Sequence, residues 1–215
     1  MEDFTFKQKY DINDLRIIMA LLRSGNGCPW DREQNHLSIK KNMIEEAYEA
    51  AQAITDGDNE ALCEELGDVL LQVVFHSQMA SEENSFDFDS VCDTICKKLI
   101  HRHPHVFSDT SVSGSGDVLK NWNEIKKKEK NQKDISGVME GIAGSLPALM
   151  RGQKIVKAAA REKLIEIKKT EDRKAAEEKI VSLIREAVDT AVSADIDAEE
   201  VFGDYLNEYI KSLKN

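Results

Sequence analysis

Residues 44–74 read IEEAYEAAQAITDGDNEALCEELGDVLLQVV, two charged and apolar segments joined by TDGDNE. Apolar residues recur three or four positions apart in both segments, which is the period of an amphipathic helix. We expect one helix over 37–55, ended by Gly57 in a C-terminal cap, and a second helix over 60–81. Because the connection is short, the two helices should lie antiparallel and side by side.

The remaining sequence has the same helical character. Further periodic apolar patterns predict helices over 13–24, 89–102, 117–130 and 197–213, and the chain from 148 onward is densely charged and helix-forming. Only three prolines and eleven glycines interrupt the 215 residues, and 6% are aromatic, which disfavours a many-turned β protein. We predict an all-α protein, an antiparallel helical bundle with a helical C-terminal extension.

Composition narrows the classes of partner. The formal net charge of −11 lacks the basic footprint of a protein that binds nucleic-acid polymers, although a small phosphorylated ligand remains compatible if metal cations offset its charge. No stretch approaches the roughly 18 apolar residues of a membrane-spanning helix, and the first residues, MEDFTFKQKYDIND, lack the apolar core of a signal peptide. The four cysteines form no CxxC pair, so we expect a reduced, cytoplasmic protein.

Each of the two central segments carries three acids with the same spacing. These clusters are Glu45, Glu46 and Glu49, and Glu64, Glu65 and Asp68. At 100° per residue, each cluster lies on one face of its helix, so in antiparallel neighbours the two acidic faces can approach each other. Like charges brought together in this way need a cation between them.

The composition of the segments favours a hard divalent cation. Neither acidic phrase contains Lys or Arg, and the nearest are Lys40 and Lys41. Oxygen ligands alone suit Mg²⁺ or Mn²⁺, whereas a di-iron bundle uses Glu-x-x-His, which this pair of phrases lacks. Two alternatives stay open at this point: two ordinary solvated helix faces, or a carboxylate-bridged redox metal protein. His76 lies near the acids, as a hydrogen-bonded histidine or as a further ligand.

Longer stretches of the chain resemble a known family. GCPWDREQNHLSIKKNMIEEAYEAAQAI (27–54), followed by EELGDVLLQVVFHSQMA (64–80), resembles the MazG nucleoside triphosphate pyrophosphohydrolases, whose hallmark is EExxE, a spacer and ExxD. RHPHVF (102–107), WNEIKKKEK (122–130) and SLPALMRGQKI (145–155) also look like segments of that family. The resemblance covers about residues 10–157.

The resemblance implies an all-α, dimer-forming bundle with Mg²⁺ between the acidic helices, for which Mn²⁺ is a possible substitute. It implies hydrolysis of nucleoside triphosphates to nucleoside monophosphate and pyrophosphate by attack of water on the α-phosphorus. Carried over by motif, the metal ligands are Glu46, Glu49, Glu65 and Asp68. Glu45 becomes either an acid behind the ligands or the base that activates water, and Glu64 a surface residue.

Basic and aromatic residues after the acids resemble the family's substrate-binding positions. These residues are Lys98, Arg102, Trp122, Lys126 and Lys130. The four cations form two i, i+4 pairs, as one face of a helix requires, and Arg offers a two-pronged contact to phosphate. For the lysines the alternative is a solvated helix face. For Trp122 the alternative is packing in the core or at a dimer interface.

The C-terminal third departs from the longer members of that family, which carry a second acid motif. Glu177 and Glu178 are followed by Val181 where the third acid should stand. We therefore divide the chain into a catalytic helical domain, 1–150, and a charged extension, 151–215, which we interpret as a reduced second MazG-like region without a metal site. Its expected role is core completion or dimerisation within a homodimer or higher homo-oligomer. A non-catalytic interaction protein, docking through this extension, is the alternative function.

Overall fold

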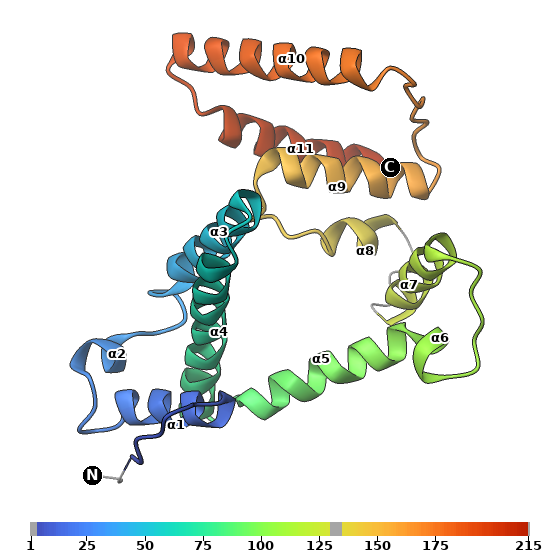
Figure 1. Ribbon diagram of the computed structural model, residues 1–215. Helices are drawn as coiled ribbons and strands as arrows, with labels where there is room; N and C mark the ends of the chain where they lie inside the picture. The colour runs from blue at the N-terminus through green and yellow to red at the C-terminus, as the bar shows by residue number, and fades with distance from the viewer. Residues whose placement is uncertain (1–3, 130–134, 215) are drawn as a thin grey trace. The chain divides into compact units, whose positions relative to one another are not determined.

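The computed structural model describes residues 4–129 and 135–214 and divides into two compact units, 1–101 and 102–215 (Figure 1). The first unit contains α1 (Ile12–Arg23), α2 (Pro29–Glu33), α3 (Lys40–Asp56), α4 (Asn59–Glu82) and α5 (Phe88–Arg102), whose last residue falls in the second unit. The second unit contains α6 (Pro104–Phe107), α7 (Ser115–Glu129), α8 (Ile135–Glu140), α9 (Ala148–Arg161), α10 (Arg173–Ala194) and α11 (Ala198–Lys214). All regular secondary structure in the described residues is helical, which confirms the all-α prediction.

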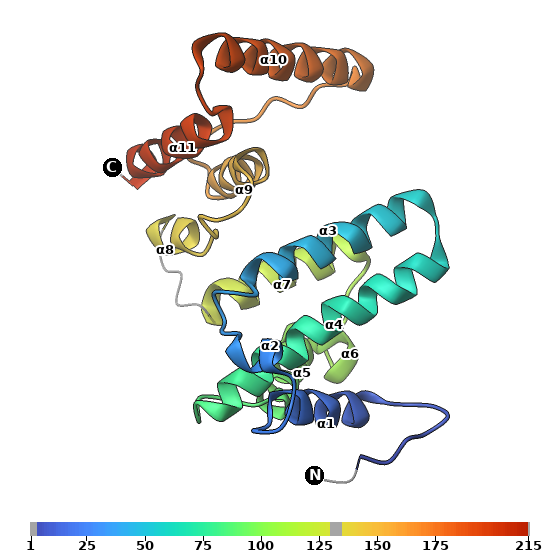
Figure 2. The same ribbon diagram turned by 90° about the vertical axis from the view of Figure 1, so that its left-hand side faces the viewer.

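The α3–α4 hairpin is the main element of the first unit. Both helices lie side by side in the two views of the molecule (Figures 1 and 2) and make its most extensive contact between elements. Gly57 ends α3 with φ of 70°, a left-handed conformation that costs glycine little, and its N–H donates to carbonyl groups of the last turn. Asp58 then caps α4 by accepting from the N–H groups of Glu60 and Ala61. The predicted antiparallel pair and its glycine cap are confirmed.

Helix α1 closes one end of this hairpin. It packs on α4, and Met19, Val74, Phe75 and Met79 are buried there together with Ile39. The apolar residues of α4 past the acidic phrase therefore form a core with α1, and the acidic half of the hairpin is left more open. This division of one long helix into a packing half and an acidic half holds the acids on a supported scaffold.

The core of the second unit lies between α8, α9 and α11. Ile155, Ala159 and Leu206 are almost fully buried in it. Gly152 is part of the same close packing, since a Cβ atom there would lie 3.2 Å from the ring of Phe202. Helix α9 begins at Ala148, whose N–H donates to the carboxylate of Glu199 on α11. Glu199, which is not part of a second acid motif, thus stabilises the N-terminus of α9.

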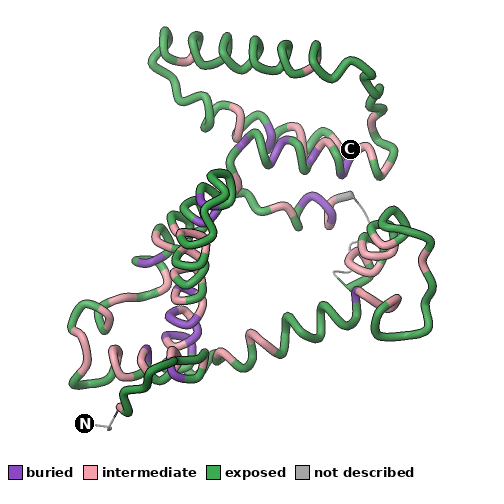
Figure 3. The backbone as a smooth tube through the Cα atoms, viewed as in Figure 1, coloured by how far each residue is buried: buried purple, intermediate pink, exposed green. Residues whose placement is uncertain are grey.

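Helix α10 differs from its neighbours because none of its residues is buried (Figure 3). Among the described residues, no helix combines the length and apolarity needed to cross a membrane.

Three short helices lie where the sequence predicts breaks or loops. They are α2, α6 and α8. Conversely, the segment 162–172 lies inside the region expected to be helical but is not helical. For α8 the reason is tertiary, because Val138 and Met139 are buried against the second unit's core in spite of flanking glycines. The predicted domain boundary at residue 150 rests on sequence motifs. The two compact units are defined by contacts between residues and do not test it, so this boundary stays a prediction.

Candidate metal centre

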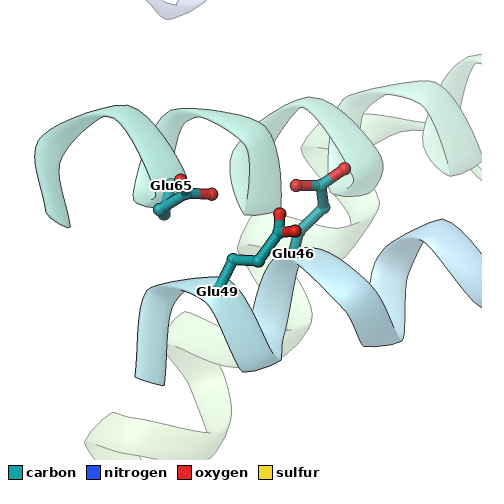
Figure 4. A group of neighbouring side chains, drawn as sticks. All are labelled: Glu46, Glu49 and Glu65. Carbon is teal, nitrogen blue, oxygen red and sulfur yellow. The ribbon is translucent and has the colours of Figure 1, made fainter. Parts of the chain in front are cut away.

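Three carboxylates from α3 and α4 meet on the facing sides of the hairpin. Glu46 and Glu49 stand one turn apart on α3, and Glu65 faces them from α4 (Figure 4). Each offers one oxygen atom, and these three atoms all lie within 4.8 Å of one another. The two acidic phrases therefore converge as their spacing predicts.

The shared space is electrostatically unfavourable for three anions. Burial raises the pKa of the Glu46 carboxyl above its ordinary value, and the charges of Asp68, Glu49 and Glu65 raise it further. The pKa of Glu65 is also raised, again first by burial and then by Glu49 and Asp68. Both shifts mean that burial, and then the charge of neighbouring acids, disfavour the ionised carboxylates, so a cation at this position would be favoured.

Asp68 lies at the edge of this group. It stands one turn after Glu65 on α4, is half-buried, and its charge acts on both Glu46 and Glu65. Glu64 is exposed on the same helix, as predicted for a surface residue. The fourth predicted ligand is thus next to the three-carboxylate group without being part of it.

Glu45 is not part of this group and forms an ion pair within its own helix. It is exposed, and its Oε1 lies 2.8 Å from Nζ of Lys41 in an i, i+4 ion pair. An exposed pair of this kind contributes little to stability. The side chain therefore has no strong contact that would hold it at Lys41.

The donor set fits a hard cation. The group contains carboxylate oxygens alone, the chemistry that Mg²⁺ and Mn²⁺ prefer. His76 is engaged elsewhere: its Nδ1 lies 2.7 Å from Nδ1 of His36, and the two rings are stacked. Of the two interpretations of His76, a hydrogen-bonded histidine or a metal ligand, the structure supports the first.

Comparison with known proteins agrees with this geometry. Residues 34–107, which include both acidic phrases, match the model of the MazG nucleotide pyrophosphohydrolase domain. A Thermotoga maritima protein named nucleoside triphosphate pyrophosphohydrolase/pyrophosphatase MazG is 36% identical over 217 residues, covering 94% of this chain and 83% of that protein. The chain belongs to the MazG family.

Other relatives are longer than this MazG-family chain. The Escherichia coli K12 protein named nucleoside triphosphate pyrophosphohydrolase is 49% identical over 150 residues, 69% of this chain and 57% of that protein. The Bacillus subtilis protein YabN, described as uncharacterized, is 45% identical over 148 residues, 69% of this chain and 30% of that protein. The chain therefore spans about a third to just over half of the length of these two relatives.

The predicted substrate residues fall in two places. Lys98 is exposed on α5 in the first unit. Arg102 is buried in the second unit, where its Nε donates to Glu129 over 2.8 Å and its guanidinium lies 5.1 Å from the centre of the Trp122 ring. Arg102 and Trp122 are thus in contact with each other, and their role in binding substrate stays a prediction.

The last two predicted positions are the lysines of α7 and the segment after it. Lys126 lines a cavity of the second unit, together with three basic residues of α9 that the MazG resemblance did not single out: Lys154, Lys157 and Arg161. Their i, i+3, i+7 spacing places them on one helix face, a signal present in the sequence. Lys130 lies outside the described residues.

Proposed function

We propose that this chain hydrolyses nucleoside triphosphates to nucleoside monophosphate and pyrophosphate in a Mg²⁺-dependent reaction. The observation that carries the proposal is the convergence of Glu46, Glu49 and Glu65 on facing helices of a MazG-family chain. A helical hairpin gains nothing in stability from placing three acids within 4.8 Å of one another. Their repulsion is understandable as preparation for a bound cation.

Four acids would hold the metal. Glu46, Glu49 and Glu65 form the group described above, and Asp68, one turn after Glu65 on α4, would be the fourth ligand. When bound, Mg²⁺ supplies charge neutralisation for the phosphate oxygens and polarises the α-phosphorus. Mn²⁺ takes the same ligands and is proposed as a substitute.

The proposed reaction is a displacement at the α-phosphorus. The oxygen of a water molecule forms a bond to that phosphorus, and the bond to the oxygen bridging the α- and β-phosphorus breaks, so that pyrophosphate leaves. The attacking water must lose a proton, and Glu45 is proposed as the base that accepts it. Its exposed pairing with Lys41 is weak enough to be given up for this role.

Contacts to the substrate are assigned to the basic and aromatic residues that follow the acids. Lys98, Lys126 and Lys130 would bind phosphate oxygens as point charges, and Arg102 as a planar fork. Trp122, with its ring already held by Arg102, would present a flat surface to a base or sugar. Nucleotide-pool house-cleaning in the cytoplasm is the proposed biological role.

A product analysis tests the reaction. Purified protein is incubated with a panel of ribo- and deoxyribonucleoside triphosphates, with Mg²⁺, Mn²⁺ or chelator, and pyrophosphate and orthophosphate are measured separately. We expect pyrophosphate and nucleoside monophosphate in equal amounts, and none with chelator. Release of orthophosphate instead would contradict attack at the α-phosphorus.

Matched variants test the site. Glu49→Gln removes one carboxylate of the group, whereas Glu64→Gln makes the same change at an exposed position of α4. We expect the first to reduce kcat/KM by about 100-fold or more and the second to leave it within about twofold, on the scale of losing an electrostatic contact in a transition state. Equal activity of both variants, or failure of Mg²⁺ to bind, would favour a non-catalytic interaction protein.

A further inference from the structure

The second unit contains a cavity of about 410 Å³ whose walls are dominated by positive charge. It is lined by residues of α7, α8 and α9 and of the segment that joins α8 to α9. The volume is at the lower end of the range for small-molecule sites, about 300–1,000 Å³. Both of its long walls are helices, which hold side chains in fixed directions.

Five basic side chains line this cavity, and we refer to it below as the basic cavity. They are Lys126, Lys127, Lys154, Lys157 and Arg161. None of the described residues that line it is Asp or Glu. The chain as a whole has a formal net charge of −11, so this cluster of positive charges is opposite in sign to the whole chain. It creates a local positive potential.

Glu162 offsets part of this charge. Glu162 accepts a hydrogen bond from Lys127 over 2.6 Å, and its other oxygen lies 3.5 Å from Nε of Arg161. One carboxylate is thus shared by two cations at the end of α9. The ordinary explanation for basic residues in the last turn of a helix is attraction to its carbonyl end, which suits Lys126 and Lys127 on α7. It does not account for Lys154 and Lys157, which lie in the middle of α9.

The lining of the basic cavity also has an apolar part, which we call its apolar floor. Val138 is buried there, and Ile142 and Leu146 are half-buried. Cations around an apolar floor match a ligand with several phosphate groups, because Lys and Arg bind phosphate oxygens and the floor accepts a flat organic group. None of the described lining residues is a carboxylate, so the lysines and the arginine themselves would balance the charge of a phosphate ligand.

We propose that the basic cavity binds a small polyphosphate anion, such as a nucleoside triphosphate or inorganic tripolyphosphate, without a divalent metal. This site takes no residue from the carboxylate group of α3 and α4. It shares Lys126 with the proposed substrate contacts, whereas its other cations on α9, Lys154, Lys157 and Arg161, have no place in the proposed reaction. A polyphosphate held by these three cations would occupy a second anion site of the chain, as an effector or as a product.

The test is binding of ATP and of tripolyphosphate to the full chain by isothermal titration calorimetry in EDTA at low salt. The double variant Lys154→Glu/Lys157→Glu reverses two charges of the basic cavity, and Lys174→Glu/Lys179→Glu makes the same change in net charge at exposed positions of α10. We expect binding by the wild type, a loss of about tenfold or more in affinity in the first variant and a change within about threefold in the second. We expect ATP to bind more tightly than tripolyphosphate, because the apolar floor holds the base.

Two outcomes would overturn the proposal: no binding by the wild type in EDTA, or an equal loss in both double variants. Circular dichroism verifies that each variant is folded, and the single substitution Lys157→Gln provides a milder change at the same place. The variant Glu49→Gln separates this proposal from the proposed hydrolysis, because it removes a carboxylate of α3 and should bind ATP in EDTA as the wild type does. If Glu49→Gln loses hydrolysis but still binds ATP in EDTA, the binding does not depend on the metal centre.

Discussion

At Glu46, burial and three neighbouring acids act in the same direction, because each favours the protonated carboxyl group. Its raised pKa means that the folded chain binds a proton here more tightly than the unfolded chain does. The resulting penalty is present when the carboxyl is ionised, at pH values above the folded-state pKa, and is relieved as the pH falls through it. A divalent cation would relieve the same penalty at neutral pH.

Replacing this carboxyl by a neutral amide should therefore have opposite effects with and without metal. At pH 7 in EDTA, Glu46→Gln removes like-charge repulsion and should raise Tm slightly, by about 1 °C. In millimolar Mg²⁺, the variant should lose most of the rise in Tm that the wild type shows. Differential scanning fluorimetry measures both values, with Glu64→Gln as control. A variant stabilised by Mg²⁺ as strongly as the wild type would remove Glu46 from the ligand set.

His76 gives the first unit a second pH-dependent feature. Burial lowers the pKa of its imidazole below the ordinary 6.5, and the neighbouring charge of His36 lowers it further. Between the folded-state pKa and about 6.5, the unfolded chain binds more protons than the folded chain, so stability should rise with pH there. The contribution is complete above about pH 6.5 and is lost on acidification.

We expect the free energy of unfolding in urea to fall between pH 7.5 and pH 5.5, and to fall less in His36→Gln. That variant removes the second imidazole while keeping a side chain that can hydrogen-bond to His76. The acids of the metal centre have the opposite pH dependence, since they favour the folded state on acidification. This effect is the same in the wild type and in His36→Gln, so it cancels when the change between the two pH values is compared between the two proteins. An unchanged difference between the two pH values in the variant would rule out the histidine pair as its source.

At the scale of single elements, the α3–α4 hairpin depends on one backbone conformation. Gly57 has φ of 70°, where a Cβ atom is strained, whereas Gly67 lies inside α4 with nothing within 4 Å of a Cβ built on it. The same substitution should have opposite signs at the two positions. Gly57→Ala should destabilise the chain by about 1 kcal/mol, and Gly67→Ala should stabilise it by about 0.5–1 kcal/mol. Urea unfolding measures both, and destabilisation by both would contradict the assignment of strain to the turn.

The elements also show which features a sequence can predict. Helices α3 and α4 follow from local signals: apolar period, a glycine cap and an N-cap acid, all within a few residues of the helix they define. The convergence of Glu46, Glu49 and Glu65 follows from the same spacing once the helices are paired.

Other features depend on contacts between distant residues. Helix α8 exists because Val138 and Met139 are buried against α9 and α11, which nothing in its own glycine-flanked sequence indicates. The contact of Arg102 with Glu129 and Trp122 likewise joins residues far apart in the chain. The basic spacing on α9 was visible in the sequence, but its meaning required α7 to lie opposite.

At the scale of the whole molecule, the expected homodimer has a candidate surface. Ile44 and Tyr48 on α3, and Leu66 and Leu70 on α4, form two i, i+4 pairs of large apolar side chains that are left exposed. Exposed apolar patches on this scale are typical of protein interfaces. Because these residues share helices with the acids, association there would also fix the hairpin that carries the metal ligands.

Light scattering after size exclusion tests this surface. The wild type should have a mass at least twice the 24.2 kDa of one chain. Tyr48→Glu/Leu66→Glu should shift it towards the monomer, because two charges cannot be buried without partners. Val181→Glu/Val192→Glu, on the exposed α10, adds the same charge elsewhere and should leave the mass unchanged. A monomeric wild type would contradict the prediction.

The turn between α3 and α4 has a further consequence for how the chain folds. Only Gly57 and Asp58 separate the two helices, so every proposed metal ligand, from Glu46 to Asp68, belongs to one local hairpin. Contacts of such low sequence separation close with little loss of chain entropy and form on the fast side of the folding timescale. During synthesis from the N-terminus, a nascent chain would hold the complete set of acids before the ribosome reaches the second unit. The chemistry of this protein would then be encoded in its earliest folding event.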